Sequence, residues 1–415
     1  MGFSAPRGTR DILPQEIGYW RYIENIAEQV FRRFNFQEIR TPIFEQTELF
    51  ARGIGTDTDI VEKEMYTFKD KKGRSITLRP EETAPIVRAY LENNLSKQEE
   101  VQKLWYQGPM FRYERPQAGR FRQFHQIGCE VLGTQSPVAD AELIQLSVQI
   151  FAELGLKELE VDINSVGCPV CRKVIRERIR SFLGDNLPHL CEDCQRRFQN
   201  NPLRILDCKN KKCRNYLMGV PSMTGALCQE CQDHFNSVLD YLDTMGVKYS
   251  HKPTMVRGLE YYTKTVFEVI SKNLGAQDAV CGGGRYDNLV KELGGAAVPA
   301  VGFAFGMERT VMVLQEQKVA IPKQTIKKIF FAVLGEPARK KALTIINAVR
   351  NKGFQADIDY NDKSLKAQLK KADKFGADQV VIIGEDEVEN KTVQLKDMKS
   401  GEQKTVPFGE LLNSL

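Results

Sequence analysis

The segment from Phe111 to Glu130 constrains the fold most, because its pattern predicts two strands joined by an arginine-rich loop. Successive side chains of a strand point to opposite faces, so every second residue shares a face. The second strand therefore gathers a ring, an amide and a carboxylate on one face, from Phe124, Gln126 and Glu130. Such a face suits a flat polar ligand.

Charged residues at the end of the first strand and in the loop extend this face. Arg112 and Glu114 point the same way, and Arg115 and Gln117 lie near the turn. Arginine binds phosphate and carboxylate groups through two parallel hydrogen bonds, so the hairpin could hold a phosphate, stack on a purine and bind a small polar substrate. A solvated hairpin with a salt-bridged outer face explains the same charges, since exposed ion pairs contribute only about 0–1 kcal/mol.

The remaining pattern up to residue 322 predicts an α+β domain. Apolar residues recur at helical spacing over residues 15–34, which predicts an amphipathic helix. Strands joined by short turns, with helices grouped outside, favour an antiparallel sheet. The expected strands are 64–68, 75–78, 101–111, 121–132, 158–164, 256–270, 279–283 and 301–305, and the further expected helices are 140–154 and 307–317.

A chain of 415 residues is too long for one core, since single cores stop growing at about 250–300 residues. We expect a catalytic domain in two parts, 1–165 and 236–322, interrupted by an insertion at 166–235. From residue 326 to 415 strands alternate with helices, which predicts a small, mostly parallel α/β domain. Its expected strands are 328–334, 356–359 and 379–383, and its expected helices are 338–351 and 365–375.

Eight of the ten cysteines lie in the insertion as close pairs, namely Cys168/Cys171, Cys191/Cys194, Cys208/Cys213 and Cys228/Cys231. In a reducing cytosol this pattern favours metal over disulfides. Nineteen residues separate Cys171 from Cys191, which fits the spacing of a four-thiolate zinc site, and the last two pairs could form another. The spacing does not fix how the pairs combine. Free thiols, or a single occupied site, fit the spacing as well. Cys129 and Cys281 are expected to be ordinary buried residues.

Charge and hydropathy limit the class of protein. Between Cys168 and Cys231 there are twelve Lys/Arg and six Asp/Glu, a net charge of +6, whereas the whole chain carries +5. A basic insertion suits a polyanion, and a solvated positive face is the alternative. No apolar run approaches the ~20 residues of a membrane helix, and the first residues have no apolar signal core, so a cytoplasmic protein without a membrane partner is expected.

Three further segments contain candidate ligand-binding residues. Residues 256–262 place Arg257 beside a glycine and two phenols. Residues 281–287 contain three glycines but lack the Lys-Ser/Thr of a P-loop and the spacing of a Rossmann fingerprint, so a tight turn is the alternative to a substrate loop. Residues 302–309 predict a strand running into a helix with Arg309 in its first turn. The helix dipole disfavours a cation there, which favours an anionic partner.

Together these segments resemble the class II aminoacyl-tRNA synthetases, and among them the histidyl-tRNA synthetase family, over essentially the whole chain. Pro42 with its neighbours, residues 112–130 and residues 306–309 resemble the three class II motifs. Residues 257–262 and 283–287 resemble the two histidine-specific signatures. The resemblance implies an antiparallel-sheet catalytic domain with a helical, cysteine-rich insertion, and a C-terminal anticodon-binding domain.

The resemblance also implies a reaction, in which a homodimer ligates L-histidine to tRNA(His) through histidyl-adenylate and releases AMP and pyrophosphate. ATP with Mg²⁺ would be bound by Arg112, Glu114, Phe124 and Arg309. Histidine would be bound by Glu81, Thr83, Arg112, Gln126, Glu130, Arg257, Tyr261, Tyr262 and Tyr286, with the imidazole against Glu130 and Tyr262. The catalytic residues would be Arg112, Arg257 and Arg309, and Arg115 and Gln117 would contact the acceptor end of the tRNA.

The chain departs from the family pattern at Glu82, which stands where a glycine is usual. An inward-pointing Glu82 would compete with the role given to Glu81. The eight-cysteine insertion is not a general family feature, so zinc rests on the spacing alone. Two other functions are compatible with this resemblance: a histidine-binding regulatory paralogue of a histidine-biosynthesis enzyme, and a tRNA-sensing module of a kinase. The C-terminal domain and the intact signatures argue against the first, and the lack of a kinase segment against the second.

Overall fold

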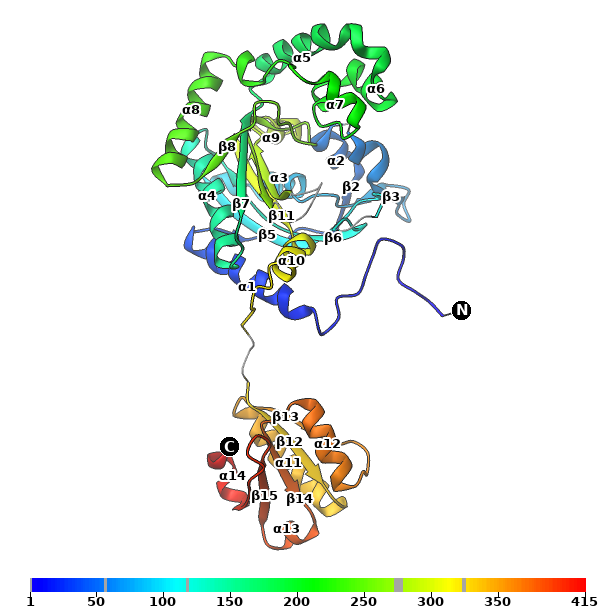
Figure 1. The fold of residues 1–415 in the computed structure, drawn as a ribbon, viewed down its shortest axis with the longest axis vertical. Coiled ribbons are helices and arrows are strands. Elements are labelled where there is room, and N and C mark those ends of the chain that lie inside the picture. The colour runs from blue at the N-terminus through cyan, green and yellow to red at the C-terminus, as the bar shows by residue number, and fades with distance from the viewer. Residues whose placement is uncertain (1, 56–57, 117–118, 272–278, 323–325) are drawn as a thin grey trace. The chain divides into compact units, whose positions relative to one another are not determined.

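The computed structural model describes residues 2–55, 58–116, 119–271, 279–322 and 326–415. The chain divides into two compact units, Met1–Ile321 and Pro322–Leu415 (Figure 1). The division falls next to the expected boundary after residue 322.

The first unit is built on an eight-stranded sheet with the order β1-β5-β6-β11-β10-β9-β7-β8. Neighbouring strands are antiparallel except at the two edges, where β1 pairs with β5 and β8 with β7 in parallel. The strands are β1 Gln37–Glu38, β5 Gln102–Phe111, β6 Gln123–Leu132, β7 Leu159–Ser165, β8 Tyr249–His251, β9 Thr263–Ser271, β10 Ala279–Arg285 and β11 Ala300–Gly306. The expected antiparallel sheet is therefore confirmed for its centre and is mixed at its edges.

One face of this sheet carries the main apolar core. Four helices cover it: α1 Ile17–Arg33, α4 Pro137–Glu153, α8 Gln229–Thr244 and α10 Met307–Glu316. Alternation along β6 sends Ile127, Cys129 and Val131 into this core. The residues between them face the other side of the sheet, as the sequence predicted.

The opposite face supports the remaining parts of the first unit. The helices α2 Thr47–Ile54, α3 Thr83–Glu92 and α9 Leu289–Glu292 contact one another there. A small sheet of order β2-β4-β3 joins β2 Phe44–Gln46, β3 Tyr66–Lys69 and β4 Ser75–Leu78. Two short helices, η1 Ile60–Glu64 and η2 Leu95–Lys97, complete this part. The small sheet and α3 frame the open side of the large sheet.

The cysteine-rich insertion is helical, as expected, and its helices α5, α6 and α7 lie together beyond the large sheet (Figure 1). Its elements are α5 Pro169–Leu183, η3 Gly184–His189, α6 Glu192–Asn200, η4 Pro202–Ile205, α7 Lys211–Tyr216 and η5 Thr224–Ala226. The chain returns through α8, which packs on α4. The boundary expected after residue 235 falls inside this continuous helix.

Residues 256–262 were expected to begin a long strand, but β9 begins only at Thr263. Arg257, Tyr261 and Tyr262 lie in irregular backbone before it. That path turns these three side chains toward the open face of the sheet, which a strand alternating between faces could not do for adjacent residues.

The second unit has a five-stranded sheet of order β13-β12-β14-β15-β16. The expected parallel strands are present as β12 Lys328–Val333, β13 Gln355–Ile358 and β14 Gln379–Ile383. An antiparallel hairpin, β15 Thr392–Asp397 and β16 Gln403–Pro407, was not predicted. The helices are α11 Glu336–Asn351, α12 Leu365–Phe375, α13 Glu385–Glu389, η7 Phe408–Glu410 and α14 Leu411–Ser414.

Candidate active site

A cavity of about 510 Å³ opens on the face of the large sheet opposite the main core. It is lined by all twelve residues predicted for ATP and histidine, which are Glu81, Thr83, Arg112, Glu114, Phe124, Gln126, Glu130, Arg257, Tyr261, Tyr262, Tyr286 and Arg309. Arg115 is exposed and outside the lining, and Gln117 lies outside the described residues. The structure thus brings the residues predicted for small substrates into one hollow.

Glu130 is a buried carboxyl in the lining of the cavity. Its side chain is almost completely buried, and Tyr286 Oη donates to Oε2 at 2.5 Å while Thr83 Oγ1 donates to Oε1 at 2.8 Å. Burial raises the pKa of Glu130 to about 8, against the lowering effect of these two hydrogen bonds. A Cβ on Gly302 would come within 1.6 Å of Glu130 Oε2, so only glycine leaves room for this carboxyl.

Three tyrosines form an aromatic wall beside Glu130. The ring of Tyr261 lies 4.9 Å from that of Tyr262 and 5.5 Å from that of Tyr286, centroid to centroid. Burial raises the pKa of each phenol, so all three remain neutral donors and acceptors. Tyr286 is the phenol that hydrogen-bonds Glu130, and the predicted contacts of Glu130 and Tyr262 with the imidazole remain predictions.

The two adjacent glutamates differ in their partners. Glu81 accepts from the backbone N–H groups of Thr83 at 2.8 Å and Ala84 at 2.9 Å, which caps the N-terminus of α3. Glu82 accepts from Thr41 Oγ1 at 2.5 Å and from Arg79 Nη1 at 2.9 Å. Burial raises the pKa of Glu82 to about 7, and Arg79 opposes that rise. Glu82 is therefore tied to Arg79 and does not displace Glu81.

Arginines dominate the other end of the cavity. Arg112 donates through Nε to Pro80 O at 2.8 Å, and its guanidinium carbon lies 5.3 Å from the centre of the Phe124 ring. Arg309, in the first turn of α10, donates to Ala279 O at 2.6 Å. Burial, followed by the charge of Arg120, lowers the pKa of Arg309. Closely spaced guanidinium groups of this kind are suited to a polyphosphate.

Arg257 meets an acidic partner that the sequence reasoning missed. Its guanidinium pairs with Glu268 of β9, and the lining includes both residues. Burial lowers the pKa of Arg257, but Glu268 outweighs it and the net shift is upward, so the group stays charged. A Cβ on Gly282 would come within 2.3 Å of Arg257 Nη2, which explains the close-approach glycine on β10. Glu268 lies opposite Gly282 in the sheet, and this pairing is the feature that could have identified Glu268 as the partner of Arg257.

Comparison with known proteins identifies the family to which the chain belongs. The sequence profile described as "Histidyl-tRNA synthetase" matches residues 8–178 and 210–310, and the profile described as "Anticodon binding domain" matches residues 328–415. This chain belongs to the histidyl-tRNA synthetase family. Residues 179–209, between the two parts matched by the first profile, fall inside the cysteine-rich insertion.

Relatives in the histidyl-tRNA synthetase family extend over the full chain. The "Histidine--tRNA ligase" of Halothermothrix orenii is 48% identical over 415 residues, covering 100% of this chain and 99% of that protein. That of Pelotomaculum thermopropionicum is 50% identical over 412 residues, covering 99% and 97%. A crystal structure of apo S. aureus histidyl-tRNA synthetase has a TM-score of 0.84 and 37% identity, with coverage of 100% and 99%.

The regulatory-paralogue alternative has weaker support than the family. A Bacillus halodurans structure titled as an ATP phosphoribosyltransferase regulatory subunit/histidyl-tRNA synthetase is 20% identical, with a TM-score of 0.67, covering 92% of this chain and 99% of that one. A likeness at that identity concerns the fold alone. In the described part of the chain, no helix combines the length and apolar character needed to cross a membrane.

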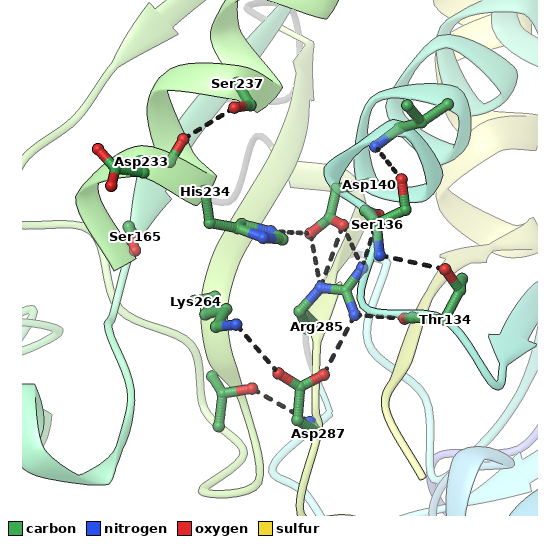
Figure 2. A network of polar contacts seen from close by, with 12 residues as sticks. Thr134, Ser136, Asp140, Ser165, Asp233, His234, Ser237, Lys264, Arg285 and Asp287 are labelled. Carbon is green, nitrogen blue, oxygen red and sulfur yellow. Dashed lines mark hydrogen bonds and ion pairs between the residues drawn. The ribbon is translucent and has the colours of Figure 1, made fainter. Parts of the chain in front are cut away.

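A buried ionic network surrounds Arg285, in the segment 283–287 at the end of β10 (Figure 2). Arg285 is fully buried and donates to Thr134 O at 2.8 Å, to Ser136 O at 3.1 Å and to both carboxyl oxygens of Asp140. Burial opposes the charge of Asp140, but Arg285 lowers its pKa to about 2. His234 Nε2 lies 3.4 Å from Asp140 Oδ1. The network fixes the end of β10 next to Tyr286.

The cysteines group differently from the sequential grouping that their spacing suggested. The Sγ atoms of Cys168, Cys171, Cys228 and Cys231 lie within 4.8 Å of one another, and so do those of Cys191, Cys194, Cys208 and Cys213. The first pair therefore meets the last, and the two middle pairs meet each other. The sequential grouping was wrong because the insertion folds back, so that its first and last helices begin side by side. Cys129 and Cys281 are buried as expected, although Cys281 also lines the cavity.

Proposed function

We propose that this chain ligates L-histidine to tRNA(His) with ATP, through a histidyl-adenylate intermediate that releases pyrophosphate and then AMP. The observation that carries the proposal is the single cavity that joins a cluster of arginines to a buried carboxyl and three tyrosines. The first end suits the phosphates of ATP, and the second suits an imidazole. Full-length relatives named histidine--tRNA ligase support the same reaction.

Formation of the adenylate at the nucleotide end of the cavity needs no protein nucleophile. The histidine carboxylate attacks the α-phosphorus in line with the departing pyrophosphate. Arg112 and Arg257 neutralise the charge that develops on the α-phosphate, and Arg309 binds the γ-phosphate. Phe124 stacks on the adenine, with Glu114 near its amino group. Mg²⁺ bound to ATP would neutralise part of the charge on the outer phosphates, beside Arg309.

The histidine end selects its substrate by hydrogen bonding. A neutral imidazole offers one donor and one acceptor, which a carboxyl and a phenol satisfy together. Tyr286 and Thr83 hold Glu130 for this contact, while Tyr261 and Tyr262 enclose the ring. An amino acid without both groups would leave buried polar atoms unpaired, which discriminates by about 10⁴ or more. The ammonium group binds beside Glu81, Thr83 and Gln126.

The tRNA engages two parts of the chain. Arg115, exposed after β5, and Gln117 bind the acceptor end, and the second unit binds the anticodon. The match of that unit to the profile described as "Anticodon binding domain" supports this assignment. Transfer of the histidyl group to the terminal ribose then releases AMP.

The working form is a cytoplasmic homodimer with structural zinc in the insertion. The segment around Pro42 contains Ile43 and Phe44, which are 43% and 54% exposed, and Phe68 of the same small sheet is 48% exposed. Apolar side chains gathered at such a surface are typical of a subunit interface. The eight clustered cysteines supply the thiolates that zinc prefers.

The test is ATP–pyrophosphate exchange with each of the twenty amino acids, where we expect exchange with histidine alone. Arg257→Ala should lower the histidine-dependent rate by about 10²–10³, because it removes a fixed positive charge at the α-phosphate. Arg32→Ala, on the exposed face of α1, is the matched control and should leave the rate unchanged. Exchange by Arg257→Ala at the wild-type rate, with an unaltered circular dichroism spectrum, would remove the proposed role of Arg257.

A further inference from the structure

The two cysteine clusters have the geometry of four-thiolate metal sites. Zinc–sulfur bonds of about 2.3 Å in a tetrahedron place the sulfur atoms about 3.8 Å apart. Cys168 Sγ lies 3.6 Å from Cys171 Sγ, and Cys191 Sγ lies 3.9 Å from Cys208 Sγ. These separations are far longer than a disulfide bond of about 2.05 Å and close to the tetrahedral value.

In both clusters a backbone hydrogen bond joins two cysteine pairs. We call this arrangement nested, because the first pair in sequence meets the last and the two middle pairs meet each other. The N–H of Cys228 donates to Cys171 Sγ at 3.1 Å, and the N–H of Cys191 donates to Cys213 Sγ at 3.2 Å. Each bond joins pairs that are distant in sequence, 57 residues apart in the first cluster and 22 in the second. Hydrogen bonds to ligand sulfur orient a metal site, so they indicate built sites rather than chance proximity.

The clusters sit at different places in the insertion. The proximal cluster, Cys168/Cys171/Cys228/Cys231, closes its base, where α5 and α8 begin. The distal cluster, Cys191/Cys194/Cys208/Cys213, lies in the segment between α5 and α8, where α6 begins and α7 follows. Each member of the proximal set and the first pair of the distal set lies at or just inside the N-terminus of a helix.

The segment enclosed by the distal cluster reaches the histidine pocket. Between Cys194 and Cys208, Arg204 donates to the carbonyl of Gly258, and Asn201 donates to the carboxylate of Glu260. Gly258 itself lines the cavity, and Glu260 lies in sequence between the lining residues Leu259 and Tyr261. Leu203 and Ile205 are buried in the same apolar cluster as Tyr261 and Tyr262. The loop that carries Tyr261 and Tyr262 therefore packs against the distal part of the insertion.

Charged residues next to the distal cysteines enter the cavity itself. Asp207, Lys209 and Arg214 line the same hollow as Arg257 and Glu130, and they flank Cys208 and Cys213 in sequence. None of the three was anticipated from the sequence. Their placement depends on how the chain is held at those two cysteines, because each side chain is one residue from a thiol.

We propose that the clusters are two independent zinc sites with nested ligands, and that the distal site positions segment 256–262 and the Lys209/Arg214 wall of the cavity. Zinc in the proximal site closes the insertion at its base. Zinc in the distal site braces the loop that carries Arg257, Tyr261 and Tyr262. The positioning role rests on the proposed function for its kinetic readout, whereas the metal sites do not.

The metal sites are tested first, on the purified full-length chain. Elemental analysis should find two equivalents of zinc per chain, and Co²⁺ substituted for zinc should give the absorption of two four-sulfur tetrahedral sites. Zero or one equivalent would overturn the two-site assignment. Cys129→Ala, outside both clusters, is the control and should keep two equivalents.

Two quadruple variants distinguish nested from sequential ligation. Replacing Cys168, Cys171, Cys228 and Cys231 with serine removes one nested site whole, so one four-sulfur Co²⁺ site should remain. Replacing Cys168, Cys171, Cys191 and Cys194 leaves two sulfurs in each nested site, so tight binding should be lost at both. The reverse result would overturn the nested ligation.

If the serine variants fail to fold, the ligand grouping can be measured on the wild-type chain instead. After partial zinc removal with a chelator, the exposed thiols are alkylated and mapped by mass spectrometry. Nested sites predict that Cys171 and Cys228 become labelled together, separately from Cys194 and Cys208. Joint labelling of Cys171 with Cys194 would overturn the grouping.

The positioning role is tested with Arg204→Ala, which removes the contact to Gly258 and touches no cysteine. The KM for histidine in ATP–pyrophosphate exchange should rise about tenfold with kcat little changed and zinc content intact, and Arg204→Lys should restore part of the loss. Arg196→Ala, on the exposed side of α6, is the matched control. An unchanged KM in Arg204→Ala would overturn the positioning role. Absence of exchange in the wild type would instead refute the proposed function, and the zinc and cobalt results would still decide the sites.

Discussion

Replacing Glu130 with glutamine should change how stability depends on pH. The folded-state pKa of Glu130 is raised to about 8 from 4.5, chiefly by burial. Between those values the folded chain keeps a proton that the unfolded chain has released. The contribution of Glu130 to stability is therefore complete below about pH 4.5, falls as the pH rises toward 8, and is level above that.

The size of the effect follows from proton linkage. One extra proton in the folded state costs about 1.4 kcal/mol of unfolding free energy per pH unit, so wild type should lose about 3 kcal/mol between pH 5.5 and 7.5 through this residue. Glu130→Gln lacks this loss. Glu81 and Glu82, whose pKa values are also raised, remain in both proteins, so their contributions largely cancel in the difference.

Urea unfolding followed by tryptophan fluorescence measures this directly. The chain has two tryptophans, Trp20 and Trp105, and both are buried in the first unit, so the signal reports the unit that contains Glu130. The unfolding free energy of Glu130→Gln relative to wild type should rise from pH 5.5 to 7.5. Glu99→Gln, an exposed change of the same kind, should follow wild type. Parallel pH profiles for wild type and Glu130→Gln would refute the reasoning.

Two further predictions concern the framework around the cavity. Asp140→Asn leaves Arg285 buried without its main counter-charge and should lower the unfolding free energy by about 3–5 kcal/mol in the same fluorescence assay. Asp287→Asn, at the partly exposed partner, should cost clearly less, and equal losses would contradict the assignment. Gly302→Ala places a Cβ where Glu130 Oε2 lies and should raise the KM for histidine at least tenfold in pyrophosphate exchange. An unchanged KM would show that Glu130 can move without loss of binding.

Local periodicity predicted the elements that position the cavity. The alternation along β6 separates Ile127 and Cys129, which enter the core, from Gln126 and Glu130, which line the cavity. That assignment needs only the two-residue repeat of a strand. The helical spacing before residue 34 likewise predicted α1, which the structure has at Ile17–Arg33.

Features that depend on long-range folding were not predictable in this way. Spacing identified four cysteine pairs, but which pairs meet depends on how α5 to α8 fold back. Asp207, Lys209 and Arg214 enter the cavity for the same reason. The β15–β16 hairpin was missed although Val393, Leu395 and Val406 alternate with polar residues, because its polar turn and short strands resemble a loop.

Arg79 links the cavity to a surface outside it. Its guanidinium donates to Thr41 O at 3.1 Å and Pro109 O at 3.0 Å, and it pairs with Glu82 beside Glu81. Thr41 precedes Pro42 in the segment proposed to meet a second chain. Arg79 and Glu82 thus join the residue before Pro42 to the start of α3, whose first N–H groups are bound by Glu81. A displacement of Thr41 would therefore reach Glu82, and through it the first turn of α3, where Thr83 lines the cavity.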